Sequence, residues 1–240
     1  MKKTLTVITG ASSGIGEAVA KRFSEEGHPL LLLARRLERL EALNLPETIC
    51  SKVDVTDSAM FCRAIRQAEE KYGPVECLVN NAGVMLLGDV SIQNANEWKT
   101  MFDVNVLALL NGIQAVLGSM KKRKSGTIIN ISSIAGRKTF PSHAAYCGTK
   151  FAVHAISENV REEVAGSGVR VITVAPGAVE TELLSHTTSN EIKNGYDDWK
   201  NSMGGVIVAD DIARSVMFAF NQPQNVCIRE IVIAATRQQP

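Results

Sequence analysis

The sequence predicts an α/β fold in which a parallel sheet of about seven strands is doubly wound and carries helices on both faces. Short apolar runs alternate with longer amphipathic runs along the whole chain, which is typical of strands joined by right-handed helical crossovers. Most short runs are apolar at consecutive positions, as strands covered on both faces must be. No repeat or Pro/Ser-rich linker divides the chain, so residues 1–240 are expected to form a single Rossmann-like domain.

The short apolar runs give the predicted strands their bounds. They are Leu5 to Thr9, Leu30 to Ala34, Ile49 to Asp54, Cys77 to Asn80, Thr127 to Ser132, Val169 to Ala175 and Val226 to Ile233. The longer runs supply the helical layers: Ile15, Val19 and Phe23 recur every four residues, and leucines recur every three residues from 37 to 43. Each pattern places one apolar stripe against the sheet.

Two predicted helices, Met101 to Leu117 and Tyr146 to Val164, have apolar positions on more of their circumference than one sheet contact needs. A stripe facing the sheet uses only one side of a helix. We interpret the surplus as a surface that joins copies of this chain. Coverage by neighbouring helices of the same chain is the alternative.

The segment from Glu180 to Val206 differs from the rest of the chain. It is mostly polar, with Tyr196, Trp199 and Met203 among its few large hydrophobes. Long segments of this kind in compact domains are often functional, so we interpret residues 180–206 as a mobile substrate lid; an ordinary surface excursion is the alternative. Its candidate hinges are Gly195, Gly204 and Gly205.

Composition and charge exclude several classes of function. A hydrophobic content of 45% and a charged content of 21% are typical of globular proteins, and no run reaches the roughly 18 to 20 apolar residues of a membrane span. A net charge of +1 provides no overall field for nucleic acid or anionic membranes. The five cysteines contain no C-x-x-C pair, so neither a disulfide framework nor a metal site is expected. The expected location is cytoplasmic.

A glycine-rich turn separates the first predicted strand from the first predicted helix. It reads Thr9-Gly10-Ala11-Ser12-Ser13-Gly14-Ile15-Gly16. Glycine lets backbone N–H groups approach a diphosphate, and the N-terminus of the next helix offers unpaired donors and a partial positive charge. A simple tight turn is the alternative, but this position between strand and helix is the one that nucleotide binding requires.

The spacing G-x-x-x-G-x-G resembles the glycine motif of the short-chain dehydrogenase/reductase family. Asn80-Asn81-Ala82-Gly83 resembles the family motif that supports the sheet around the cofactor. Pro176-Gly177, with Val179 and Thr181, is similar to the segment that holds the nicotinamide carboxamide, and Asp54 matches the position that meets the adenine. The resemblance runs from residue 4 to about 234. It implies a nicotinamide cofactor bound by Gly10, Ser12, Ser13, Gly14, Ile15, Gly16, Arg35, Arg36, Asp54, Val55, Asn81, Ala82, Gly83, Tyr146, Lys150, Pro176, Gly177, Val179 and Thr181.

The end of the second predicted strand indicates which nicotinamide cofactor is preferred. A carboxylate there binds the ribose 2′-hydroxyl of NAD and repels the 2′-phosphate of NADP. Ala34 takes that position, and Arg35 and Arg36 follow it. Two guanidiniums without an acid suit a phosphate, so the predicted cofactor is NADP(H); the alternative is that both arginines only solvate the next helix.

Tyr146 and Lys150 lie four residues apart, on one face of a predicted helix. A tyrosine with a pKa of about 10 needs a stabilised phenolate to exchange protons near neutrality. Ser133 precedes Tyr146 by thirteen residues, which is the family's spacing and favours it over Ser132. The resemblance implies that Tyr146 is the general acid and base, Ser133 binds the substrate oxygen, and Lys150 binds the nicotinamide ribose and lowers the pKa of Tyr146. It also implies that Asn105, which matches the family's helix asparagine, supports a water that relays protons.

For other polar side chains near these motifs, exposed loop positions are favoured over a role in substrate binding. His143 and His186 could line the substrate side, although solvated loop positions are favoured, and none of the four histidines has metal spacing. Arg137 and Lys138 could recognise an acidic substrate, although exposed loop charges are favoured.

These motifs predict an NADP(H)-dependent oxidoreductase that interconverts a secondary alcohol and a carbonyl through a Ser-Tyr-Lys-Asn site. Family habit implies a homotetramer, or a dimer. Within the family the sequence resembles bacterial 3-hydroxy acid or serine dehydrogenase-like members and, more narrowly, the Vibrio-type NADPH-binding blue-fluorescent reductases. The alternative is an NADPH-binding protein with little turnover whose bound reduced cofactor fluoresces blue, but the intact tyrosine, lysine and serine argue against it.

Overall fold

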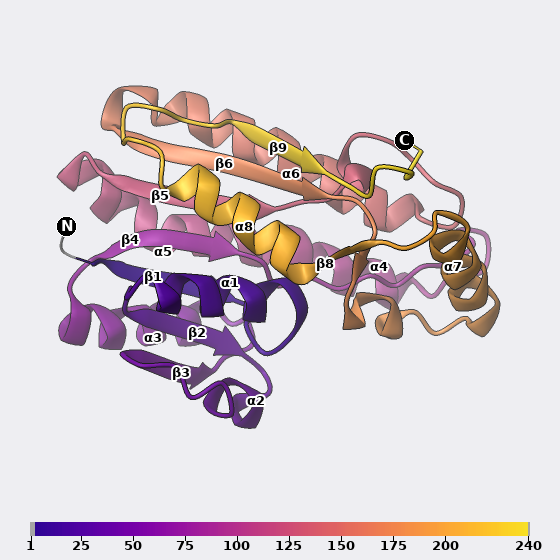
Figure 1. Ribbon diagram of the computed structural model, residues 1–240, viewed down its shortest axis with the longest axis horizontal. Helices are drawn as coiled ribbons and strands as arrows, with labels where there is room; N and C mark the ends of the chain where they lie inside the picture. The colour runs from indigo at the N-terminus through magenta and orange to yellow at the C-terminus, as the bar shows by residue number, and fades with distance from the viewer. Residues whose placement is uncertain (1–2, 240) are drawn as a thin grey trace.

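A seven-stranded parallel sheet organises the computed structural model, which describes residues 3–239 (Figure 1). The strand order is β3-β2-β1-β4-β5-β6-β9, and every neighbouring pair is parallel. The predicted fold class, a single Rossmann-like α/β domain, is confirmed. The strands are β1 (Leu5–Thr9), β2 (Leu30–Ala34), β3 (Thr48–Lys52), β4 (Val75–Asn80), β5 (Gly126–Ile131), β6 (Val169–Pro176) and β9 (Glu230–Ile233).

The predicted bounds of β4, β5 and β6 differ from the structure by one or two residues, and the largest errors fall on the two edge strands, β3 and β9. Lys52, the last residue of β3, pairs with Ala34, the last residue of β2. No partner strand is left for Asp54, which therefore follows β3 instead of ending it. The strand expected from Val226 begins only at Glu230, because Val226 N–H donates to Pro223 O in a turn.

Helices cover both faces of the sheet, and each face has its own buried core. One core includes Val19 and Phe23 of α1 (Gly14–Glu25) and Ile212 of α8 (Ala209–Phe220); these two helices lie in front of the sheet in Figure 1. The short α2 (Leu37–Glu41) adds Leu40 to this core. The opposite face carries α3 (Ser58–Tyr72), α5 (Ala108–Arg123) and α6 (Ala144–Glu163).

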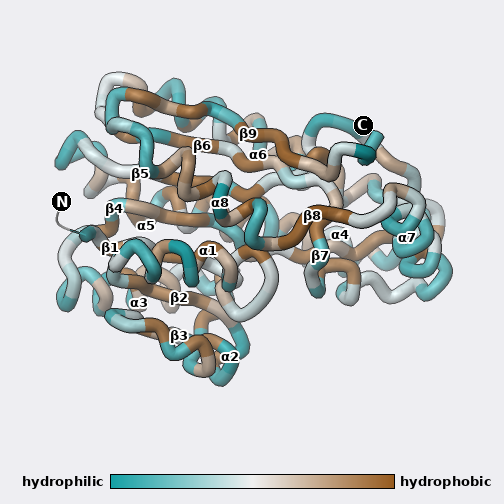
Figure 2. Tube along the Cα trace, in the orientation of Figure 1, coloured by the Kyte–Doolittle hydropathy of each residue, from teal (hydrophilic) through white to brown (hydrophobic). Residues whose placement is uncertain are grey.

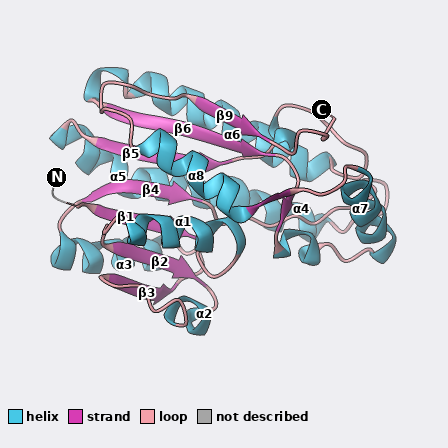
Figure 3. Ribbon diagram, in the orientation of Figure 1, coloured by secondary structure: helices cyan, strands magenta, loops and turns pink. Residues whose placement is uncertain are grey.

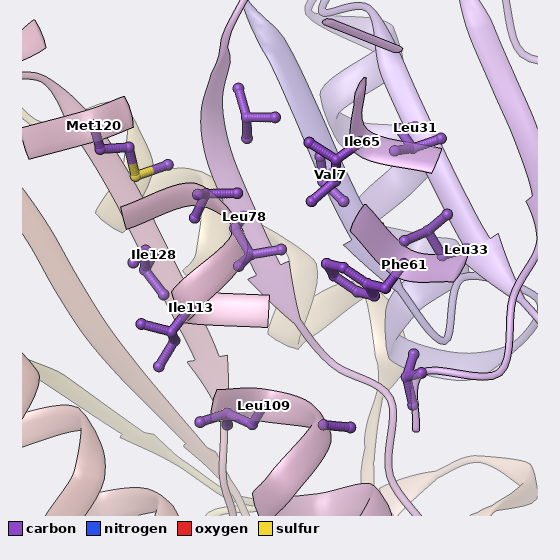
Figure 4. Close-up of a cluster of buried hydrophobic side chains, with 14 of the residues drawn as sticks. Val7, Leu31, Leu33, Phe61, Ile65, Leu78, Leu109, Ile113, Met120 and Ile128 are labelled. Atoms are coloured by element: carbon purple, nitrogen blue, oxygen red, sulfur yellow. The ribbon is translucent and has the colours of Figure 1, made fainter. Parts of the chain in front are cut away.

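The core between the sheet and α3 and α5 shows why the strands are apolar at consecutive positions. Leu31 and Leu33 of β2 point toward Phe61 and Ile65 of α3 (Figure 4). The neighbouring Leu30 and Leu32 belong to the core on the other face. Because alternate side chains of a strand point to opposite faces, both sets must be apolar. The strands are accordingly mostly brown in Figure 2, whereas the outer helices carry teal segments.

One long helix corrects the expectation that no run is long enough to cross a bilayer. It combines α4 (Ala95–Phe102), a π-helical turn η1 (Asp103–Leu107) and α5, and its 29 residues meet a length and hydropathy criterion for a span. In the structure Leu109, Ile113 and Val116 are buried against the sheet. Packing on the sheet therefore accounts for the apolar residues on that side.

The segment predicted as a lid lies beyond the carboxyl ends of the strands (Figure 3). It is folded as the short helix η4 (Glu182–His186) and α7 (Asn190–Ser202), between the two-stranded sheet β7 (Val179–Glu180) and β8 (Ile207–Val208). Gly195 lies inside α7, while Gly204 and Gly205 follow it with positive φ. The remaining short helices are η2 (Ile134–Gly136) and η3 (Ala165–Ser167).

Candidate active site

A cavity of about 720 Å³ opens at the carboxyl ends of the central strands. In doubly wound sheets ligands bind at this edge, where the strand order reverses between β1 and β4. All the predicted cofactor residues line it except Gly16, and all the predicted catalytic residues line it except Asn105. The sequence-predicted site residues are therefore brought together around one space.

The glycine-rich turn is held against the segment that follows β4. Thr9 Oγ1 accepts hydrogen bonds from Asn81 N and Ala82 N, each at 2.9 Å. Asn81 Nδ2 donates to Thr9 O at 2.9 Å. The two motifs are far apart in the sequence, but these hydrogen bonds hold them together at this edge of the sheet.

Two glycines in the turn allow this close packing. Gly10 has φ +64°, and a Cβ added to it would lie 2.8 Å from Ala82 Cα. A Cβ on Gly16 would lie 2.4 Å from Gly10 O and 2.5 Å from Asn81 Nδ2. Gly16 therefore packs the turn from behind and does not line the cavity, so its position favours a packing role over the predicted direct contact with the cofactor.

Arg36 lies over the turn, at the end of the cavity where β2 ends. Its Nη2 donates to Ser13 Oγ at 3.0 Å and to Ser12 Oγ at 3.2 Å, and its Nη1 donates to Glu182 of η4 at 3.0 Å. Arg39 also binds Glu182, at 2.8 Å, and the two arginines lower the pKa of Glu182 to about 2. Arg36 thus lies between the serine hydroxyls of the turn, which accept from it, and the Glu182 carboxylate; Arg35 is exposed.

This end of the cavity has the features of a nucleotide-binding site. Ser13 precedes α1 without capping it through its side chain, so the first N–H groups of α1 keep the orientation that suits a diphosphate. Ala34, Arg35 and Arg36 all line the cavity, and the position that carries a carboxylate in NAD sites carries a methyl group. Asp54 lines the same end, where Thr56 N and Thr56 Oγ1 donate to its carboxylate at 3.0 and 2.7 Å.

Tyr146, Ser133 and Lys150 meet at the centre of the cavity. Tyr146 and Lys150 are buried on α6, and Lys150 Nζ lies 5.8 Å from the centroid of the Tyr146 ring. Lys150 Nζ donates to Ile131 O, at the end of β5, at 3.1 Å. Ser133 begins η2, where its Oγ accepts from Ala135 N at 3.1 Å, and its side chain hydrogen-bonds Tyr146.

Burial is the largest influence on the pKa values of Tyr146 and Lys150. It raises the pKa of Tyr146 well above its usual range; the nearby Tyr196 adds to the rise, while the hydrogen bond with Ser133 opposes it. Burial lowers the pKa of Lys150 to about 8. In this structure Ser133 is thus the partner that lowers the pKa of Tyr146, an effect that the family resemblance assigns to Lys150; for Lys150 it stays a prediction.

Ser132 and Ser133 both line the cavity, but they are used differently. Ser132 is buried, and its Oγ donates to Lys150 O at 3.3 Å. Ser133 is the serine that reaches Tyr146. Of the two serines, the one that the thirteen-residue spacing favours is therefore the one beside Tyr146; its catalytic role stays a prediction.

Asn105 lies in the π-helical turn η1, outside the cavity lining. Its Oδ1 accepts from Val84 N at 2.8 Å, and its Nδ2 donates to Val84 O at 2.9 Å and to Thr149 Oγ1 at 3.1 Å. Thr149 Oγ1 in turn donates to Tyr146 O at 2.7 Å. The side-chain amide is therefore committed to fixing the segment after β4 and the helical turn that carries Tyr146.

The other end of the cavity is walled by apolar and aromatic side chains. α7 presents Ile192, Gly195, Tyr196 and Trp199 to it, at the i, i+3, i+4, i+7 spacing of one helix face. Additional lining residues come from separate parts of the chain: Met85, Phe140, Leu183 and Leu184. His143 and His186, both partly buried, also line the cavity, which agrees with the less favoured of their two interpretations.

The segment after β7 is attached to the rest of the domain at several points. Thr187, between η4 and α7, is buried; its Oγ1 donates to Met85 O and accepts from Leu87 N, both at 3.1 Å. Thr188 Oγ1 donates to Glu97 at 3.3 Å. These contacts define the place of α7 over the cavity; its mobility stays a prediction.

Sequence reasoning missed a residue near the chain end. Gln238 lines the cavity, and its Oε1 accepts from Ala178 N at 2.9 Å. A Cβ on Gly177 would collide with this side chain at 2.3 Å. Gln238 follows the last strand in a polar tail, and no motif in the sequence marks it.

Comparisons with known proteins agree with this geometry. A family model described as short chain dehydrogenase matches residues 4–192. An uncharacterized oxidoreductase of Staphylococcus saprophyticus is 41% identical over 245 residues, which cover 99% of this chain and 98% of that protein.

Solved structures match over nearly the whole chain. The closed form of serine dehydrogenase complexed with NADP+ has a TM-score of 0.92 at 28% identity, covering 99% of this chain and 97% of that chain. Alcohol dehydrogenase from the archaeon Thermococcus sibiricus, complexed with 5-hydroxy-NADP, has a TM-score of 0.86 at 26% identity, covering 99% of both chains.

Proposed function

The chain belongs to the short-chain dehydrogenase family, and from that premise we propose that it is an NADP(H)-dependent oxidoreductase that interconverts a secondary alcohol and a carbonyl compound. The observation that carries the proposal is the meeting of Tyr146, Ser133 and Lys150 in one cavity, whose far end holds Arg36 on the glycine-rich turn. When bound, NADP(H) supplies or accepts the hydride. The chain's own side chains then have to move one proton and hold the reacting oxygen.

Tyr146 is the proton donor of the proposed reduction. Because burial raises its pKa, the phenol carries its proton at neutral pH, as a general acid must. Ser133 hydrogen-bonds the same phenol and is placed to donate to the substrate oxygen. Lys150 is proposed to bind the nicotinamide ribose and, when protonated, to favour the phenolate that remains after proton transfer.

Asn105 is proposed as a positioning residue, because both polar atoms of its side chain bind Val84 and Thr149. A part in the proton relay would fall to its backbone. Loss of its amide should misplace the turn of α6 that carries Tyr146, since Thr149 links the two.

The preference for NADP(H) is supported by Arg35 and Arg36 beside the uncharged Ala34. Arg36 is the stronger candidate for the 2′-phosphate, because it already lies on Ser12 and Ser13. Serine dehydrogenase and the Thermococcus sibiricus enzyme were solved with NADP+ and 5-hydroxy-NADP, which agrees with this preference. The remaining proposed cofactor contacts are Gly10, Gly14, Ile15, Asp54, Val55, Asn81, Ala82, Gly83, Pro176, Gly177, Val179 and Thr181, with Gly16 packing behind them.

Self-association as a homotetramer is proposed from two exposed apolar groups. The first comprises Phe102, Leu107, Leu110 and Phe151 on the long helix and α6, which are 38% to 52% exposed. The second comprises Phe218 of α8 and Val232 of β9, which are 59% and 52% exposed. Apolar clusters of this kind mark interaction surfaces. Light scattering at micromolar concentration should give the mass of four chains, and a monomer would overturn the proposal.

The test of the proposed function is the Tyr146→Phe variant, which keeps the ring and removes the proton. Loss of absorbance at 340 nm with NADPH and a panel of ketones and aldehydes should show turnover in the wild type and almost none in the variant. Blue emission on adding NADPH should show that both proteins bind it. Emission without turnover in the wild type would favour the NADPH-binding alternative, and full activity of the variant would remove Tyr146 from the mechanism. The closer likeness to 3-hydroxy acid or serine dehydrogenases and to the Vibrio-type reductases stays a prediction.

A further inference from the structure

We propose that the substrate end of the cavity takes an uncharged carbonyl compound that bears an aromatic or bulky apolar group, and that it discriminates against carboxylates. The substrate end is the part of the cavity lined by Met85, Phe140, His143 and the face of α7 from Ile192 to Lys200. This inference rests on the proposed function and names its substrate class.

A continuous set of rings leads outward from Tyr146. The His143 ring lies 6.3 Å from the Tyr146 ring, and the Tyr196 ring stacks on His143 at 6.4 Å with an interplanar angle of 28°. Trp199 packs edge-on to Tyr196 at 5.2 Å. Ring faces and edges of this kind favour apolar and aromatic ligands. A substrate carbonyl at Tyr146 would therefore place its substituent along these rings.

The cavity-facing side of α7 leaves room for a bulky substituent of the substrate. Gly195 lies on the cavity-facing side of the helix, and a Cβ added there would meet nothing within 4 Å. Met85 and Phe140 also line the cavity; Met85 belongs to the buried cluster that contains Tyr146, and Phe140 packs against that cluster. Apart from Lys200, these lining residues present apolar or aromatic groups to the cavity.

The cationic side chains of the cavity either lie at its other end or already have hydrogen-bonding or ionic partners. Among the described lining residues, Arg35 and Arg36 lie at the glycine-turn end, and Lys150 donates to Ile131 O. Lys200 lies at the substrate end, but its Nζ is 3.0 Å from Asp197 and 3.4 Å from Glu180. Two carboxylates thus face one ammonium, so the local charge opposes a further anion.

The two histidines of the cavity do not supply a positive charge that could bind a carboxylate. His143 Nδ1 lies 2.6 Å from Pro141 O, and burial lowers the pKa of His143. Burial and the nearby Arg35 and Arg36 lower the pKa of His186. Both imidazoles are therefore neutral at pH 7, and a buried carboxylate without a cationic partner is strongly disfavoured.

The charged residues that follow Ser133 also lie outside this end. Arg137 and Lys138 are absent from the cavity lining. Arg137 forms an ion pair with Glu230, and Lys138 Nζ lies 5.5 Å from the Phe140 ring centroid. Neither is placed to bind an acidic substrate.

The test compares methyl benzoylformate with benzoylformate, which differ in a charge next to the reacting carbonyl. With NADPH, the wild type should reduce the ester with a kcat/KM at least about 100-fold higher than the acid. Because the ester is also more electrophilic, the deciding arm is the double variant Glu180→Gln/Asp197→Asn, which frees Lys200. It should raise kcat/KM for benzoylformate by about tenfold and leave the ester within about twofold.

The matched control is Asp198→Asn, which removes a charge from α7 at an exposed position without a contact to Lys200. It should leave both substrates unchanged. Trp199→Ala should raise the KM of methyl benzoylformate by about tenfold and leave that of the small 2,3-butanedione unchanged. A wild type that prefers benzoylformate, or a double variant without effect on it, overturns the substrate class while the reductase function stands. NADPH binding without oxidation by any of these carbonyls overturns the proposed function itself.

Discussion

The two ends of the cavity are built by different means. At the cofactor end, two motifs are packed tightly together through glycines and through hydrogen bonds that join the side chains of Thr9 and Asn81 to the backbone. At the substrate end, large side chains come from separate segments, including α7 and the loop with Phe140. A tightly packed glycine turn tolerates almost no added atom. A cavity wall made of large side chains can change one residue at a time. Specificity for the substrate can therefore vary on an unchanged cofactor site.

Gly16→Ala is the sharpest way to test this contrast. The new methyl group would lie 2.4 Å from Gly10 O and 2.5 Å from Asn81 Nδ2, so the turn must move away from the segment after β4. We expect the affinity for NADPH to fall by about 1,000-fold, with a loss of stability of about 2–4 kcal/mol. NADPH emission titration and urea unfolding measure the two effects.

Gly195→Ala is the matched control at the substrate end, because its Cβ meets nothing within 4 Å. Alanine favours a helix over glycine by about 1 kcal/mol, so this variant should bind NADPH normally and unfold at slightly higher urea. Equal behaviour of the two variants would show that the two ends do not differ in this way.

Arg36→Ala tests the charged part of the cofactor end. It removes the guanidinium that lies on Ser12 and Ser13 and should lower the kcat/KM for NADPH by about 100-fold, with little change for NADH. Arg39→Ala is the control, since it loses the pair with Glu182 without a contact to the two serines. The same loss for both cofactors would place Arg36 outside 2′-phosphate recognition.

The same contrast explains what the sequence could predict. Gly10, Asn81 and Tyr146 belong to local motifs that resemble those of a known family, so the resemblance was enough to predict that they meet at one site. The apolar runs likewise located the central strands, because burial on both faces requires them. Edge positions such as Asp54 and Val226 were misplaced, since pairing there depends on where the neighbouring strand ends.

The substrate end escaped prediction for a physical reason. Met85 and Phe140 reach it only through tertiary packing, as Gln238 reaches the Pro176-Gly177 segment, and no local pattern records either approach. The polar texture of residues 180–206 hid two helices, because α7 buries only one narrow face with Ile192 and Tyr196. Most of the remaining residues of α7 are polar and face solvent, so the segment looked polar in its overall composition.

Lys150 lies where the two ends meet, and its burial has a cost in stability. Its pKa is about 8 in the folded protein, below the usual value of 10.5. The unfolded chain therefore binds more protons between these values, so the stability of the wild type rises with pH from 8 to 10.5. Lys150→Met should raise the unfolding free energy at pH 7 by about 1–3 kcal/mol, after loss of the bond to Ile131 O, while reductase activity falls.

Urea unfolding at pH 7 and at pH 9.5 measures this gain. The difference between variant and wild type should be full at pH 7 and should shrink at pH 9.5, as the wild-type lysine loses its proton. A wild type that is more stable than Lys150→Met at pH 7 would show that burial of the ammonium is fully compensated by its contacts.

Gln238→Ala should have the smallest effect, because it tests a single contact between the chain end and the cavity. It leaves Ala178 N without the Gln238 Oε1 acceptor at 2.9 Å, next to the Pro176-Gly177 motif. Loss of one partly buried hydrogen bond corresponds to about 0.5–1.5 kcal/mol, so the KM for NADPH should rise by about threefold to tenfold with an unchanged melting temperature. Gln239→Ala, one residue on and exposed, should match the wild type. If both variants match it, the tail only covers the cavity, and the cofactor end is complete without a contribution from Gln238.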